Sequence, residues 1–110
     1  VDGGMSDNIR PALYQAKYTF LSALRPDAPH DRASTIAGKL CETGDILGSD
    51  VLLPEMEPGE ILACAATGAY GYSMASNYNK QPKPAVVAVF GGETRILARR
   101  ETYEDLVRLD

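Results

Sequence analysis

The sequence predicts an all-β domain, a sandwich or barrel with only short helices. Apolar and polar residues alternate with a period of two in several segments, most clearly over 13–24 and 94–99. Glycine and proline turns separate these segments, and the helices that the pattern allows are short. Short strands joined by such turns are typical of sandwiches and barrels.

Length and composition limit the possible classes of protein. The chain has 110 residues, of which 45% are hydrophobic and 24% charged, so we expect one domain over residues 1–110. It carries 11 basic and 15 acidic residues and no basic cluster, which argues against a nucleic-acid partner. No apolar run is long enough to cross a membrane and no signal pattern is present, so we expect a cytoplasmic protein.

The first half of the chain predicts a glycine turn followed by strands. Residues 1–5 resemble the end of a strand that enters a turn, and this start suggests a chain cut from something longer. Arg10 precedes a proline, which favours an extended backbone at Arg10. Strands are predicted over 13–24 and 34–40, and the second of them ends at Cys41.

The middle of the chain predicts shorter strands and one irregular region. Residues 46–54 indicate a pair of short strands interrupted by Gly48-Ser49-Asp50. Residues 61–66 form an apolar run of the length expected for a core strand. Residues 68–79 are rich in small, hydroxyl and amide side chains and predict a loop or one short helix.

The last third contains the clearest local signals. A valine-rich strand over 85–90, a Gly-Gly turn and an alternating strand over 94–99 predict a β-hairpin. Thr102, with Asp105 three residues later, predicts a capped helix. An apolar stripe on that helix should dock on the sheet; it consists of Tyr103, Leu106 and Val107.

Three polar stretches suggest one shared site. Cys41 and Glu42 come directly after a predicted strand, and loop residues in such positions often carry function. The commoner alternative is a buried structural cysteine beside a solvated acid. Arg10 with Tyr14, and Tyr70 in the irregular region, are residues that bind anions and aromatic groups. An exposed, solvated arginine is the alternative at Arg10.

Metal and disulfide chemistry receive little support. Cys64 lies in an apolar run, where a buried structural thiol is expected, and a disulfide with Cys41 stays open. His30 is the lone histidine, so a zinc site is not expected.

Taken together, these motifs resemble the C-terminal part of the diaminopimelate decarboxylase family, in order and over essentially the whole chain. The matching stretches are 1–14, Cys41-Glu42-Thr43-Gly44-Asp45, Gly68-Ala69-Tyr70-Gly71, Ser76-Asn77-Tyr78-Asn79, 82–85 and 99–106. The resemblance implies a C-terminal β domain of a fold-type III pyridoxal-phosphate enzyme that works as a head-to-tail homodimer. It also implies conversion of meso-2,6-diaminopimelate to L-lysine, the last step of lysine biosynthesis.

The resemblance assigns roles residue by residue. Cys41 would be the proton donor that reaches the partner subunit's cofactor. Glu42 would bind the distal ammonium of the substrate, and Arg10 with Tyr14 would bind its distal end. Tyr70 would contact both pyridoxal phosphate and substrate. Because that distal end is itself an amino acid, a cation and an anion are both needed to recognise it.

The sequence also departs from the complete enzymes. The N-terminal (β/α)8 barrel is absent, and with it the lysine that binds the cofactor and the glycine-rich phosphate cradle. We therefore expect residues 1–110 alone to be an inactive fragment that contributes half of a composite site. Two alternatives stay open: an ornithine, arginine or carboxynorspermidine decarboxylase of the same architecture, and a stand-alone β domain without catalysis.

Overall fold

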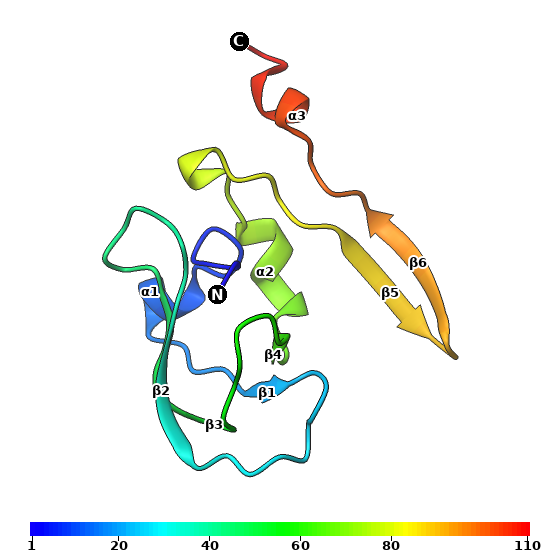
Figure 1. The fold of residues 1–110 in the computed structure, drawn as a ribbon. Coiled ribbons are helices and arrows are strands. Elements are labelled where there is room, and N and C mark those ends of the chain that lie inside the picture. Colours follow the sequence, from blue (N-terminus) through cyan, green and yellow to red (C-terminus); the bar gives the residue numbers. More distant parts are fainter.

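The computed structural model describes residues 1–110 and confirms a mainly β domain with short helices (Figure 1). Its elements, in chain order, are α1 (Arg10–Tyr14), β1 (Phe20–Ser22), β2 (Arg32–Ala37), β3 (Ile46–Leu53), β4 (Leu62–Cys64), α2 (Gly68–Met74), the 3-10 helix η1 (Tyr78–Lys80), β5 (Val86–Phe90), β6 (Glu93–Ala98) and α3 (Tyr103–Val107).

The strands pair two by two into antiparallel sheets: β1 with β4, β2 with β3, and β5 with β6. The first two sheets enclose a small core of Phe20, Ile36 and Leu53. Ten of the 110 residues are buried, so this core covers only a small part of the chain. No helix is long and apolar enough to cross a membrane.

A bulge joins the two strands that the sequence predicted within residues 46–54. Ser34 pairs with Val51 and Ile36 with Gly48, so β3 contains one residue more than β2 between these pairs. The prediction of an interruption at 48–50 was therefore wrong, because the bulge absorbs these residues within one strand. Gly48 is required there, since a Cβ atom would lie 2.7 Å from Val51 Cγ2.

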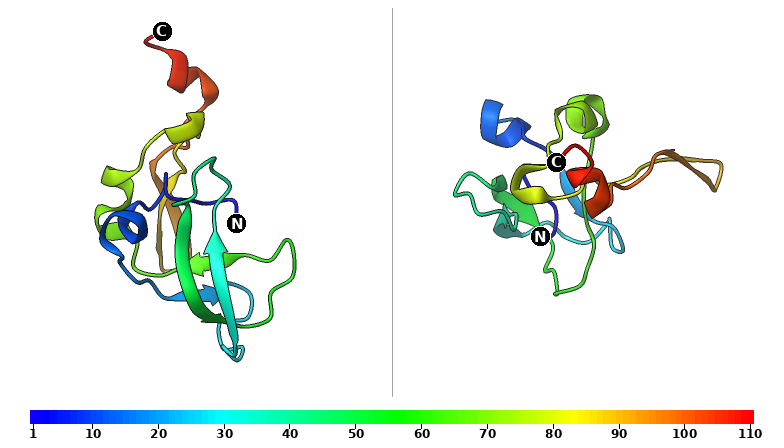
Figure 2. Two further views of the ribbon diagram at one scale, coloured as in Figure 1. Left: turned by 90° about the vertical axis from the view of Figure 1, so that its left-hand side faces the viewer. Right: turned by 90° about the horizontal axis from the view of Figure 1, so that it is seen from above.

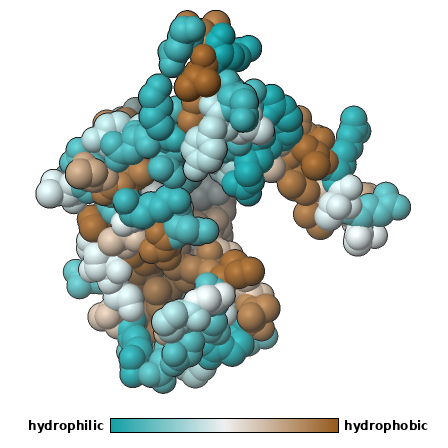
Figure 3. All heavy atoms as spheres, turned by 45° about the horizontal axis from the view of Figure 1, so that its top comes forward, coloured by the Kyte–Doolittle hydropathy of each residue, from teal (hydrophilic) through white to brown (hydrophobic).

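The predicted hairpin is confirmed. Phe90 pairs with Glu93 across a two-residue turn, and Gly91 and Gly92 both have positive φ, at 58° and 80°. The hairpin projects from the body of the domain (Figure 2), and its tip residue Phe90 is 90% exposed. A hollow of about 440 Å³ separates it from the body. Figure 3 shows apolar surface both on this arm and on the body.

The region before β1 differs from the prediction. Arg10 is the first residue of α1 rather than extended, and of the predicted strand over 13–24 only Phe20–Ser22 pairs as a strand. Proline is tolerated in the first helical turn because the N–H that it lacks has no partner there. Gln15 then ends the helix in the left-handed region at φ 55°.

The C-terminal helix is capped as predicted but does not dock on a sheet. Thr102 and Asp105 form the reciprocal capping box of α3. Tyr103 is 72% exposed, and α3 stands apart from the three sheets (Figure 1). The docking prediction was wrong because the helix is held through its polar first turn, where Arg99 binds Asp105 at 2.6 Å, rather than through its apolar side chains.

A buried carboxylate organises the start of the chain. Asp45 is 2% exposed, and its two oxygens accept the N–H groups of Met5 at 2.7 Å and Leu40 at 2.8 Å. Residues 1–5, predicted as a strand end, instead form an irregular segment that Asp45 ties to the loop after β2. Gly4 and Gly38 are glycines because a Cβ atom at either position would collide with this carboxylate.

We expect Gly38→Ala to destabilise the domain. The new methyl group overlaps the Asp45 carboxylate, and displacing it leaves two partly buried N–H groups without their partners, at a cost of up to about 1–3 kcal/mol each. The measurement is the thermal midpoint of the complete gene product that contains residues 1–110, together with hydrogen exchange at Met5 and Leu40.

Gly68→Ala is the matched control, because nothing lies within 4 Å of a Cβ atom at that position. Equal effects of the two substitutions would contradict the importance of the buried carboxylate.

Candidate functional site

The side chain of Arg10 lies between two tyrosine rings. Its guanidinium carbon is 5.1 Å from the centre of the Tyr14 ring and 4.9 Å from that of Tyr70. Such cation–π contacts hold a guanidinium in place without neutralising its charge. Arg10 makes no ion pair, and its Nη1 has only the sulfur of Met74 at 4.0 Å. The guanidinium is therefore oriented and free to bind an anion.

Two helices supply these three residues. Arg10 and Tyr14 lie one turn apart on α1, which places them on the same helix face. Tyr70 lies at a kink within α2, where its φ is 67°. A positive φ is uncommon for a tyrosine and costs free energy, so the kink is held by its surroundings. It turns the Tyr70 ring toward α1.

Cys41 and Glu42 form a second group, on the loop between β2 and β3. Both side chains are exposed. The Glu42 carboxylate accepts the Gly44 N–H at 3.1 Å, and the Cys41 N–H is donated to Asn79 Oδ1 at 3.0 Å. At the end of the loop, the Asp45 carboxylate accepts the Leu40 N–H and so links the two ends of the loop.

The structure thus brings Arg10, Tyr14 and Tyr70 into contact, and it places Cys41 and Glu42 on a separate loop. Both groups are tied to the same N-terminal turn. Met5 in that turn is bonded to Asp45, and the Ser6 carbonyl accepts the Ser76 N–H at 2.9 Å, just after α2. None of the five main pockets is lined by any of the five predicted site residues; Arg10 is half-buried and the other four are exposed.

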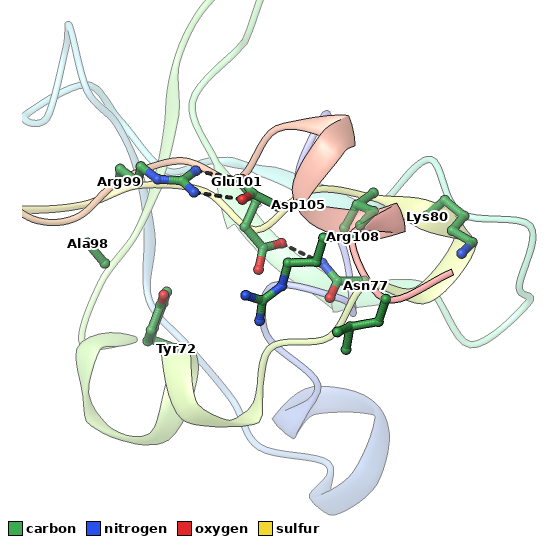
Figure 4. Close-up of a pocket in the computed structure, with 10 residues that line it drawn as sticks. Tyr72, Asn77, Lys80, Ala98, Arg99, Glu101, Asp105 and Arg108 are labelled. Atoms are coloured by element: carbon green, nitrogen blue, oxygen red, sulfur yellow. Dashed lines mark hydrogen bonds and ion pairs between the residues drawn. The ribbon is translucent and has the colours of Figure 1, made fainter.

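A polar pocket of about 620 Å³ lies between η1, the end of β6 and α3 (Figure 4). Glu101 Oε2 accepts the Asn77 amide at 2.6 Å and the Lys83 N–H at 2.8 Å. These two donors lower the pKa of the Glu101 carboxyl, with the Lys83 N–H contributing most. Sequence analysis assigned no role to Glu101; the two amides at Asn77 and Asn79 were the available signal.

The two thiols and the single histidine do not form a further site together. Cys41 and Cys64 are both free thiols, and partial burial raises the pKa of Cys64. His30 Nδ1 lies 3.0 Å from the Leu52 carbonyl. No group of three or more histidine, cysteine, aspartate or glutamate residues is placed to hold a metal ion.

Comparison with known proteins gives the family. The model of the pyridoxal-dependent decarboxylase, C-terminal sheet domain, matches residues 1–68, which is more than half of the chain. The chain belongs to this family. The match includes Arg10, Tyr14, Cys41 and Glu42, and it ends two residues before Tyr70.

Relatives within the family are similar over the whole chain. The diaminopimelate decarboxylase of Bacillus subtilis is 60% identical over 110 residues, which are 100% of this chain and 25% of that protein. The diaminopimelate decarboxylase of Synechocystis is 54% identical over 110 residues, which are 24% of its length. The chain therefore spans about a quarter of the length of the curated relatives that it matches.

Solved structures of the family have the same fold. Diaminopimelate decarboxylase from Helicobacter pylori, complexed with L-lysine, superposes with a TM-score of 0.88 at 40% identity, covering 99% of this chain and 27% of that one. The M. jannaschii enzyme in co-complex with L-lysine gives a TM-score of 0.89 at 38% identity, covering 99% and 25%. The family fold is thus present across the whole chain, including the projecting hairpin and α3.

The pocket in Figure 4 yields a prediction on pH. The Arg99 guanidinium, with the Thr102 N–H, holds the pKa of Asp105 far below its ordinary value. Because the folded pKa is lowered, the ionised form stabilises α3 fully above the ordinary aspartate pKa of about 3.9, and this contribution is lost as the pH falls toward the folded pKa.

We expect Arg99→Gln to raise the pKa of Asp105 toward that ordinary value. The measurement is a carboxyl-carbon NMR titration of the complete gene product labelled at aspartate. Arg95→Gln is the matched control, since Arg95 is exposed on β6 and makes no ion pair. A titration unchanged by Arg99→Gln would contradict the assigned cause.

Proposed function

We propose that residues 1–110 act as the C-terminal sheet domain of a pyridoxal-phosphate-dependent diaminopimelate decarboxylase. This enzyme removes CO2 from meso-2,6-diaminopimelate and leaves L-lysine, as the last step of lysine biosynthesis in the cytoplasm. The observation that carries the proposal is the 60% identity to the Bacillus subtilis enzyme over the full length of the chain. The two superposed structures complexed with L-lysine, the product of that reaction, support it.

The candidate site residues fit a role in which they contact pyridoxal phosphate from one side while another surface holds most of the cofactor. Cys41 and Glu42 are exposed, the Tyr70 ring is 65% exposed, and none of the three lines a main pocket. A ligand that touches them needs a second wall, which the barrel domain of a longer chain would supply. When bound, the cofactor supplies an electron sink for the carbanion that decarboxylation leaves.

Arg10 and Glu42 would recognise the distal end of the substrate. That end carries a carboxylate and an ammonium group, for which Arg10 is a cation without an ion-pair partner and Glu42 an exposed anion. Tyr14 and Tyr70 hold the guanidinium plane, which leaves its N–H groups for a carboxylate. A plain diamine precursor would leave Arg10 without its partner and bind poorly.

Cys41 would donate the proton that replaces CO2. The S–H bond breaks, its proton forms a C–H bond at the carbon that lost CO2, and the thiolate takes a new proton from solvent. The exposed position of Cys41 on its loop suits delivery to a cofactor on another surface. We therefore propose a homodimer, in which this loop completes the partner subunit's site.

A substrate panel tests the function. We expect the complete gene product, supplied with pyridoxal phosphate, to release CO2 from meso-diaminopimelate. L-ornithine, L-arginine and carboxynorspermidine should be poor substrates, because none presents the same amino acid at its distal end. Preference for one of these would favour the alternative decarboxylases, and inactivity on all four would favour a domain without catalysis.

We expect Cys41→Ala to lower kcat by about 10²- to 10⁴-fold, the usual contribution of a positioned general acid. KM should change far less, because the thiol acts after binding. Cys64→Ala is the matched control, since Cys64 packs against the core rather than facing outward. Unchanged turnover in Cys41→Ala would remove Cys41 from the mechanism.

A further inference from the structure

The loop that carries Cys41 has one main-chain donor bonded to a residue outside it. Within residues 38–45, the other bonded N–H groups find acceptors inside the loop, among them the side chains of Glu42 and Asp45. The Cys41 N–H is instead donated to Asn79 Oδ1, 38 residues away, at 3.0 Å. This hydrogen bond is therefore the tether at the thiol-bearing residue itself.

Asn79 meets two separate requirements at its position. Its backbone is left-handed, with φ 53° and ψ 30°, a conformation that asparagine adopts more readily than most residues. Its side-chain oxygen also accepts the Cys41 N–H. Lys80, the next residue, is left-handed too, at φ 57°, and its ammonium has no hydrogen-bond or ion-pair partner.

The turn that carries Asn79 is itself anchored. The Asn77 amide donates to the Gln81 carbonyl at 3.0 Å and to Glu101 Oε2 at 2.6 Å. Glu101 also accepts the Lys83 N–H. Figure 4 shows the Asn77–Glu101 hydrogen bond. Gln81 Nε2 in turn donates to the Asn79 carbonyl at 3.4 Å, so hydrogen bonds connect Glu101, before α3, through the turn to Asn79 and Cys41.

We propose that Asn79 is a positioning residue for Cys41, fixing the loop so that the thiol faces the carbon that it protonates. This inference rests on the proposed function and adds to it a residue outside the predicted site. Proton transfer depends steeply on distance and alignment, so a loosened loop slows protonation. Asn79 itself does not touch the reacting atoms in this proposal.

Three substitutions separate the hydrogen bond from the backbone conformation. Asn79→Gly keeps the left-handed backbone and removes the acceptor, whereas Asn79→Asp keeps both. Lys80→Gly is the matched control, because it relaxes the neighbouring left-handed residue without touching Cys41. All are made in the complete gene product with pyridoxal phosphate bound.

In Asn79→Gly we expect faster hydrogen exchange at the Cys41 amide, a small fall in the thermal midpoint and a kcat lowered about 3- to 10-fold, the range given by the loss of one hydrogen bond. The solvent deuterium isotope effect on kcat should rise, because protonation becomes slower relative to other steps. Asn79→Asp should restore most of the turnover, and Lys80→Gly should match the unsubstituted protein in all four measurements.

Faster exchange with unchanged kcat and isotope effect in Asn79→Gly would overturn the positioning role. So would an equal loss of turnover in Lys80→Gly, since that would trace the effect to the turn rather than to the hydrogen bond. If Cys41→Ala leaves turnover unchanged, the proposed role of Cys41 fails, and the positioning role falls with it even where exchange at the Cys41 amide still responds.

Discussion

The buried carboxylate of Asp45 is the constraint on which the rest of this half of the domain depends. It satisfies main-chain donors from the N-terminal turn and from the loop after β2, and it leaves no space for a Cβ atom at Gly4 or Gly38. A polar group buried in such a place must be hydrogen-bonded to be tolerated. Its position therefore fixes both segments that bear candidate site residues.

A second polar anchor, Glu101, holds the turn around η1 and the segment before β5. Glu101 gathers the Asn77 amide and the Lys83 N–H, while Arg99 and Asp105 secure the start of α3 beside it. The two anchors are joined at the Asn79 hydrogen bond to Cys41. Polar contacts, more than the three-residue core, thus place the loops relative to one another. This fits a domain whose remaining apolar surface, on the hairpin and α3, is exposed.

The open position of the site residues agrees with the small share of the relatives that this chain represents. A site enclosed within 110 residues would line a pocket, whereas Arg10, Tyr14, Tyr70, Cys41 and Glu42 line none of the main ones. The guanidinium of Arg10 is already held between the Tyr14 and Tyr70 rings in the domain by itself, as the proposed recognition of an anion by Arg10 would require. Such preorganisation lowers the conformational-entropy cost of binding.

The sequence by itself determined the features that local chemistry specifies. The Gly-Gly hairpin turn, the Thr102 capping box and the mainly β class follow from positive φ, reciprocal hydrogen bonds and a period of two, which need only neighbouring residues. The family motifs also picked out the five candidate site residues, and their roles stay predictions.

Only the tertiary structure decided which segments lie together. Arg10 became helical although it precedes a proline, and residues 48–50 became a bulge within a strand that pairs with β2. The Arg99–Asp105 ion pair holds α3 by its polar first turn, away from the sheets. The burial of Asp45 and the bond from Asn79 to Cys41 could not be predicted, since a hydrogen bond across 38 or 40 residues leaves no periodic trace in the sequence.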